Sequence, residues 1–162
     1  MMSMFENIYL YTGDKDIKAV AEQIAAAIRG EVTHDRDQVV VARRLSADSD
    51  ASVSGKVERN PFYESPPNPQ HPEVMALYDI SYDVWCPLSE EEQAREAASV
   101  FNDITDRLEW PALLTHNGDL LIAAWAPATG RTEFPPGTSS YAESQELWNP
   151  YADPAGIAHP AP

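Results

Sequence analysis

The sequence predicts an α+β fold in which two pseudo-repeated strand-helix-strand-strand units form one mainly antiparallel sheet with two helices on one face. Three observations lead to this prediction. Residues 32–42 echo residues 114–123, each with Thr-His near its start and an apolar run towards its end. A long amphipathic helical pattern precedes both segments, and a strand pattern precedes both helices. Two such units supply six strands, and the sheet face opposite the helices is expected to stay free for a partner or a ligand.

The first unit, about residues 7–45, opens with a strand and a helix. Apolar and aromatic side chains alternate over residues 7–12, as they do in a half-buried strand. Apolar residues from Ile17 to Ile28 then recur at steps of three and four, which predicts a helix with one buried stripe. Asp14 or Asp16 can cap the start of this helix with a side-chain oxygen.

The end of this first helix and the strands after it are marked by turn residues. Gly30 is expected to adopt the left-handed conformation that often ends a helix. Residues 31–33 and 39–41 have strand character, and the polar residues 35–37 lie between them. A hairpin is therefore predicted for the end of the first unit.

The second unit, about residues 75–126, begins with a strand over residues 77–85. Apolar and polar side chains alternate there, as expected for a strand that is covered on one side. The face expected to point at the helices holds Tyr78, Ile80, Tyr82 and Val84.

The following helix and hairpin have clear boundary signals. Ser89 stands three residues before Glu92, which predicts a capping box at the helix start. The helix is expected to end at Trp110-Pro111, because the residue before proline disfavours helical geometry. Asn117-Gly118 then tolerates the positive φ angles of a tight turn and predicts a second hairpin.

Proline is concentrated outside these units. The chain has 14 prolines, most of them in a polar loop over residues 46–74 and in the segment 127–162. We therefore predict a single α+β domain over residues 1–126, with the two units joined by the loop. The C-terminal segment is expected to be extended and partly docked onto the body.

The charge limits the partners. The chain has 26 acidic and 11 basic residues, a net charge of −15 and a pI near 4.4. Nucleic acid and anionic membranes repel such a chain, whereas a basic protein attracts it. No apolar run reaches the roughly 20 residues of a membrane span. The start of the chain lacks the pattern of a secretory signal, and Cys86 is the only cysteine, so a cytoplasmic location is predicted.

No pattern in the sequence predicts catalysis, a cofactor or a metal. Glycine-rich phosphate loops and hydrolase motifs are missing. Cys86 lies three residues before the helix cap and is interpreted as a small buried side chain rather than a nucleophile. The histidines are expected to be exposed in turns and loops, because no pair has the short spacing of metal ligands. They are His34, His71, His116 and His159.

One constellation favours binding instead. Aromatic and acidic residues alternate out of phase with the core positions and are expected to project from the sheet face that the helices leave free. These residues are Tyr9, Tyr11, Asp79, Asp83 and Trp85. Aromatic side chains supply contact area, and carboxylates accept paired hydrogen bonds from arginine. Asp79 and Asp83 are four residues apart on a strand, about 13 Å, too far for a glycosidase pair.

Two functions follow from these features. The first is an immunity-type protein, not an enzyme, that neutralises a basic toxin or effector domain by direct binding. The second comes from topology: the predicted arrangement over residues 7–126 resembles that of gyrase-inhibitor-like drug-binding domains, where a groove between two units holds ligands. That resemblance implies a small-molecule binding or sensing protein, with Trp85 and Trp125 lining the groove. The oligomeric state is left open by the sequence.

Overall fold

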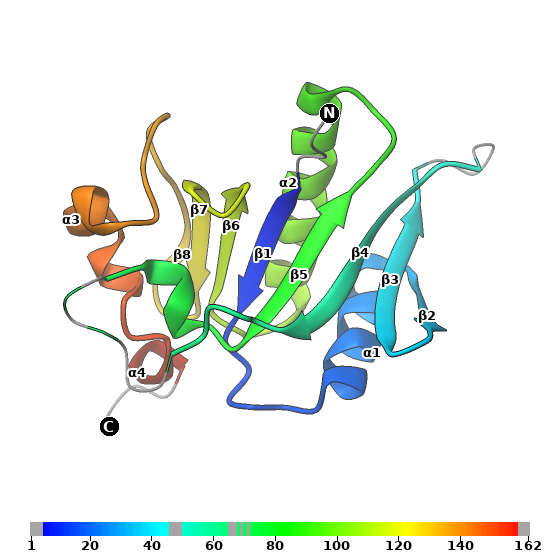
Figure 1. The fold of residues 1–162 in the computed structure, drawn as a ribbon, viewed down its shortest axis with the longest axis horizontal. Helices are drawn as coiled ribbons and strands as arrows, with labels where there is room; N and C mark the ends of the chain where they lie inside the picture. Colours follow the sequence, from blue (N-terminus) through cyan, green and yellow to red (C-terminus); the bar gives the residue numbers. More distant parts are fainter. Residues whose placement is uncertain (1–4, 46–49, 65–67, 69, 71, 159–162) are drawn as a thin grey trace.

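The computed structural model describes residues 5–45, 50–64, 68, 70 and 72–158 of the chain. Its centre is one antiparallel sheet in the order β2-β3-β4-β5-β1-β6-β7-β8 (Figure 1). The α+β class and the antiparallel sheet are as predicted, but the sheet has eight strands rather than six. The strands are β1 (Glu6–Leu10), β2 (Glu31–Asp35), β3 (Gln38–Arg44), β4 (Ser52–Arg59), β5 (Ile80–Trp85), β6 (Ala112–His116), β7 (Leu120–Ala126) and β8 (Gly130–Glu133).

Two long helices and several short ones accompany the sheet. The α-helices are α1 (Ile17–Ile28), α2 (Glu90–Arg107), α3 (Gln145–Trp148) and α4 (Pro154–Ala158). Short 3-10 turns form η1 (Val74–Leu77), η2 (Ala142–Ser144) and η3 (Asn149–Tyr151). Asp16, one of the two predicted caps of α1, accepts the N–H of Ala19 (3.3 Å). Ser89 accepts the N–H of Glu92 (3.2 Å), which is one half of the capping box predicted for α2.

The two segments that echo each other form hairpins at different places in the sheet. One hairpin is β2–β3 and the other is β6–β7, whose turn residues Asn117 and Gly118 have positive φ angles of 53° and 77°. β2 is an edge strand, whereas β6 lies beside β1 near the centre. β1 is therefore held between β5 and β6, two strands that come much later in the chain.

β4 lies within the segment that the sequence predicted to be a polar loop. It pairs with β3 on one side and β5 on the other. Val53 and Val57 are its buried side chains, and Gly55 takes the position between them. A Cβ on Gly55 would lie 2.1 Å from the carbonyl oxygen of Asp83, so a larger residue does not fit. The loop prediction is wrong here. The residues on the uncovered face of β4 are polar, and Gly55 interrupts the apolar residues on its buried face, so the segment lacks the apolar alternation of a strand.

The first hydrophobic cluster joins α1 and α2 to one face of the sheet. Phe101, in the middle of α2, is fully buried in it. Tyr82 is also buried there, and its hydroxyl donates to the carbonyl of Val41 (3.0 Å). The strands contribute a core that includes Ile8, Leu10, Val41, Val57, Ile80 and Val84.

The end of α1 differs from the prediction. Arg29, not Gly30, adopts the left-handed conformation (φ 61°, ψ 41°), and the Gly30 N–H donates to the carbonyl of Ala25 (2.8 Å). Gly30 is required for a different reason, since a Cβ there would lie 2.5 Å from the carbonyl oxygen of Ala42. This close approach of α1 to β3 is a tertiary contact that a local sequence pattern does not reveal.

A second hydrophobic cluster lies on the opposite face of the sheet, over β1, β6 and β7. The cover consists of η1 and the segment after β8, which contributes Trp148 from α3 and Tyr151 from η3. Trp148 is only 1 % exposed, and its indole N–H donates to the carbonyl of Tyr141 (3.0 Å). Helices therefore pack on both sides of the sheet, and the prediction of helices on one face was incomplete.

Tyr78 belongs to this second cluster and not to the helix-facing core. β5 begins only at Ile80, so the strand alternation does not extend back to Tyr78. The Tyr78 hydroxyl donates to the carbonyl of Tyr151 (3.0 Å) and ties the C-terminal segment to the start of β5.

Candidate partner-binding face

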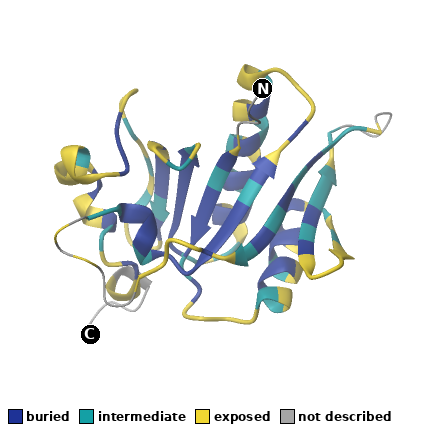
Figure 2. Ribbon diagram, viewed as in Figure 1, coloured by how far each residue is buried: buried dark blue, intermediate teal, exposed yellow. Residues whose placement is uncertain are grey.

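The cover over the second sheet face ends at β1. Figure 2 shows β6 as almost entirely buried, whereas buried and half-buried residues alternate along β3 and β4. On the face opposite α1 and α2, most described side chains of β3 and β4 are half-buried, and on β5 Ser81 is buried, Asp83 half-buried and Trp85 exposed. We call this uncovered part the open face. It is formed by Val40, Ser54, Lys56, Glu58, Asp83 and Trp85.

Two hollows adjoin at Phe5 on this side of the molecule. The larger, about 480 Å³, lies over the open face. The smaller, about 250 Å³, lies between β1 and the cover and is lined by residues that include Tyr9, Phe62 and Tyr141. Phe5 lines both, and its backbone is fixed to the β6–β7 turn, where its N–H donates to the Asn117 side chain (3.2 Å).

Exposed aromatic side chains gather around these hollows. Among the described residues, five large aromatic side chains are exposed, and four of them line one hollow or both. Trp85 is 40 % exposed, Phe5 41 % and Phe62 56 %. A concentration of exposed aromatic surface of this kind is characteristic of binding sites.

Asp83 is the carboxylate at the centre of the open face. The Asn7 side-chain amide donates to its Oδ1 (2.7 Å), and the Ser81 hydroxyl donates to the same oxygen (2.9 Å). Within the described part of the chain, no donor reaches its Oδ2. The carboxylate is therefore held in one orientation with one oxygen open to an incoming donor.

Acidic groups outnumber basic ones around the two hollows. Lys56 is the one basic lining residue among those described, and its ammonium lies 2.8 Å from the carboxylate of Glu58. Asp83 lines the larger hollow and Glu73 the smaller one. The open face thus offers negative charge beside aromatic surface.

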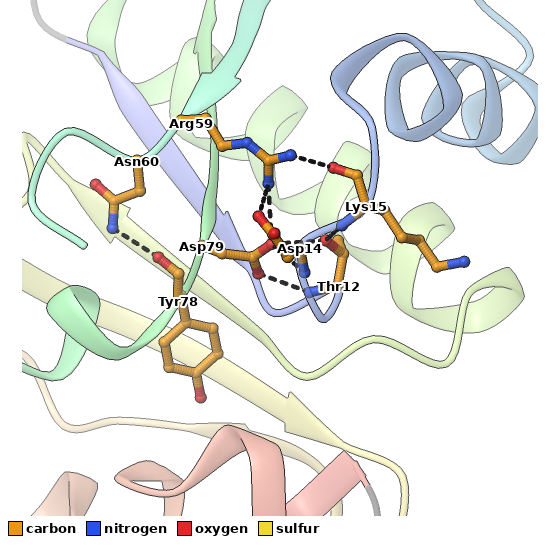
Figure 3. A network of polar contacts seen from close by, with 7 residues as sticks. All are labelled: Thr12, Asp14, Lys15, Arg59, Asn60, Tyr78 and Asp79. Atoms are coloured by element: carbon orange, nitrogen blue, oxygen red, sulfur yellow. Dashed lines mark hydrogen bonds and ion pairs between the residues drawn. The ribbon is translucent and has the colours of Figure 1, made fainter. Parts of the chain in front are cut away.

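Asp79 was expected to project from this face but is buried and serves the fold. Its Oδ1 accepts the Thr12 N–H (2.7 Å), and its Oδ2 accepts the Thr12 hydroxyl (2.7 Å) and the Asp14 N–H (3.0 Å) (Figure 3). Arg59 Nη1 lies 3.4 Å from Oδ2, and Arg59 Nη2 donates to the Lys15 carbonyl (2.6 Å). Asp79 holds the loop before α1, so it has no carboxylate oxygen left for a partner.

The two tyrosines predicted to lie on the exposed face are also less exposed than expected. Tyr9 is 2 % exposed beneath the cover, although it lines the smaller hollow. Burial strongly raises the pKa of its hydroxyl, and nearby Asp83 adds to the rise, so Tyr9 stays a neutral donor. Tyr11 is half-buried against the second cluster. Of the five predicted residues, Asp83 and Trp85 are brought together at the open face, and Tyr9 lies in the adjoining hollow.

Three contributors to the hollows were missed as site residues: Phe5, Phe62 and Tyr141. Each lies outside the strands, so the alternation pattern did not select them. All three are aromatic residues in polar or proline-rich segments, where few neighbouring apolar residues are available to bury them. This is the sequence feature that could have identified them.

Two titratable groups on the helix side, His116 and Cys86, are half-buried or buried. His116, expected to be exposed, is half-buried, with Nδ1 2.6 Å from Glu6 and Nε2 3.4 Å from Glu90. Cys86 is buried, and burial raises the pKa of its thiol, which keeps it protonated. In the described ranges, no three His, Cys, Asp or Glu side chains are placed to hold a metal ion. His71 and His159 lie outside the described residues.

Comparisons with protein-family models, with curated proteins and with solved structures find no match for this chain. No helix in the described part of the chain has both the length and the apolar character needed to cross a membrane. The function has to be inferred from geometry and charge.

Proposed function

We propose that this protein is a small acidic binding module of the immunity type, which neutralises a basic toxin or effector domain in the cytoplasm by direct contact. The open face and the adjoining hollow at Phe5 form the contact surface. In this proposal the protein performs no catalysis, and its affinity comes from aromatic anchors surrounded by acidic groups.

The observation that carries the proposal is the clustering of exposed aromatic side chains around the open face and the adjoining hollow. Phe5 and Trp85 both border the larger hollow, and Asp83 lies with them in its lining. Binding energy at protein interfaces concentrates in such aromatic anchors near the centre of the contact. The oriented carboxylate of Asp83 is suited to an arginine or lysine of the partner.

The charge of the whole chain supports a basic partner. A net charge of −15 attracts a cationic protein over long range and speeds its association. The same charge disfavours nucleic acid as a direct ligand.

The test is a capture experiment with matched baits. Wild type, Trp85→Ala, Asp83→Lys and the outer-face control Glu91→Ala are immobilised and exposed to a native lysate at low and high salt. A basic protein should be retained by wild type and by Glu91→Ala. Calorimetry with the purified partner should show that Trp85→Ala costs about 2 kcal/mol or more of binding free energy.

Association kinetics test the charge separately. Asp83→Lys should slow association and flatten its dependence on salt, because it reverses a steering charge. If one basic partner binds all four baits with equal affinity, the open face is the wrong surface. If no basic protein is retained by any bait, the proposed function is wrong.

The alternative function is small-molecule binding or sensing. The aromatic lining and the volume of about 480 Å³ favour it, since small-molecule sites span roughly 300–1,000 Å³. In this alternative the echoed hairpins mark two related units, and the ligand is cationic because Asp83 faces it. Trp85 fluorescence should then change on titration with aromatic cations, and Trp85→Phe should remove that change while leaving the fold intact.

A further inference from the structure

An arginine-rich hollow, separate from the open face, lies where α1, β3 and α2 end. It consists of two adjoining cavities of about 770 Å³ and 330 Å³. Both are lined by Arg29, Arg43 and Arg44, and the larger is also lined by Arg107. Four of the 11 basic residues in a chain of net charge −15 therefore meet at one place.

The arginines fall into two pairs by their contacts. Arg43 donates to Asp103 (2.7 Å) and lies 3.7 Å from Glu96, while Arg107 lies 3.6 Å from Asp103. These two side chains are held in place by carboxylates of α2. Arg29 and Arg44 form no ion pair with any residue that the structure describes. Their guanidinium groups retain donors for a ligand, and Asp103 is the one carboxylate in the lining of the larger cavity.

The backbone of Arg29 has a conformation that is uncommon for a residue with a side chain. Its φ of 61° lies in the left-handed region, which favours glycine and costs free energy for a residue with a side chain. The helix dipole favours a basic residue near a helix C-terminus, but any position in the last turn serves that purpose. Arg29 therefore ends α1 in this conformation beside the cavity.

We propose that this arginine-lined cavity binds a small ligand that carries a phosphate group. Guanidinium groups match phosphate oxygens with paired hydrogen bonds, and four arginines line this cavity. Arg29 and Arg44 make the direct contacts, while Arg43 and Arg107 shape the site and add positive charge. Ala27 and Ile28 also line the cavity, but both are almost fully buried, so the arginines supply the affinity.

The charge distribution limits the size of the ligand. A long polyanion such as nucleic acid extends beyond the cavity and meets the acidic remainder of the molecule, which repels it. A small phosphate compound stays within about one Debye length, roughly 8 Å at physiological salt, and experiences mainly the local positive field. A volume of about 770 Å³ is sufficient for a nucleotide or a sugar phosphate.

The test uses pyrophosphate as the probe and the full chain as the protein. Calorimetric titration at physiological salt should show saturable binding with one site per chain. Arg44→Gln should weaken this binding about tenfold or more, as expected for the loss of a hydrogen bond between charged groups. Arg95→Gln, an exposed arginine of α2 outside the cavity, should leave the affinity unchanged.

The variant Arg29→Gly tests whether the Arg29 side chain binds the ligand or only stabilises the fold. Glycine relieves the positive φ angle, so the melting midpoint of the free protein should rise while the affinity for pyrophosphate falls severalfold. Sulfate and acetate at the same concentration should compete poorly with pyrophosphate. The proposal is overturned if pyrophosphate does not bind, if Arg44→Gln and Arg95→Gln bind it equally, or if acetate at the same concentration displaces it.

Discussion

The sheet face opposite α1 and α2 has two halves, one buried beneath other segments and one exposed. Over β1, β6 and β7, η1 and the C-terminal segment cover the strands, and Trp148 is fully enclosed. Over β3, β4 and the end of β5 the side chains are half-buried or exposed, and Trp85 remains 40 % exposed. The strands of both halves alternate in the same way. Alternation therefore determines which face a side chain points to, but a distant segment determines whether that face is buried.

The two tryptophans give the largest expected contrast. Trp148→Ala should reduce the free energy of unfolding by about 3–5 kcal/mol, because it leaves a cavity under the cover. Trp85→Ala should change it by less than about 1 kcal/mol, since its side chain is outside the core. Urea denaturation of both variants checks this. Equal losses would mean that the open face is part of the folded core and not a free surface.

The two predicted aspartates, Asp79 just before β5 and Asp83 within it, provide the next contrast. Asp79→Ala should cost about 3 kcal/mol of folding free energy, because it leaves the backbone N–H groups of Thr12 and Asp14 without their acceptor. Asp83→Ala should cost about 1 kcal/mol or less, because its partners Asn7 and Ser81 can turn to water. Thermal melts of the two variants, run side by side, measure the difference. A larger loss for Asp83→Ala would contradict the assignment of roles.

Two buried tyrosine hydroxyls test how the cover is attached. Tyr78 donates to Tyr151 in the cover, whereas Tyr82 donates to Val41 within the sheet. Each substitution by Phe should cost about 1 kcal/mol. Hydrogen exchange should become faster in residues 145–156 for Tyr78→Phe only. Faster exchange in the same segment for Tyr82→Phe would show that the cover and the helix-facing core open together.

The smallest expected effect concerns Glu6, a buried carboxylate on the helix side. Burial raises its pKa above 4.5, and Glu90 adds to the rise, whereas the hydrogen bond and charge of His116 oppose it. The folded state thus holds the proton more tightly than the unfolded state. Its stabilising effect is complete below pH 4.5 and is lost as the pH rises through the raised pKa. Stability measured from pH 4 to 7 should decline relative to Glu6→Gln over this interval; a relative increase would contradict the direction of the shift.

Local signals in the sequence predicted the long helices and both hairpins. The capping residue Ser89 and the turn Asn117-Gly118 act through neighbouring backbone groups, so they are readable without tertiary information. β4 was missed because its outward side chains face the open surface and Gly55 interrupts its buried ones. A strand whose outer side chains face solvent has fewer apolar residues, so the alternation that identifies it in the sequence is harder to recognise.

The candidate site was predictable only in part. Asp83 and Trp85 share one surface because two residues of a strand separated by one other point the same way. Tyr9 points to the same side of the sheet but is buried beneath η1 and the C-terminal segment. Asp79 precedes β5 and is buried against the loop before α1. Such contacts join residues more than 60 positions apart and have no local sequence signal.

The central position of β1 has a consequence for the order of folding. This strand is made first, yet both of its neighbours, β5 and β6, are made long after it. About 75 residues must be added after Leu10 before Trp85 is in place, which takes on the order of 4 to 15 seconds at usual rates of translation. Throughout that interval the nascent chain carries a hydrophobic strand without a partner, while β2, β3 and β4 can already pair with one another. The protein is therefore expected to fold slowly, with β1 inserted after its neighbours have been made. While β1 is unpaired, the nascent chain is expected to bind chaperones at the ribosome.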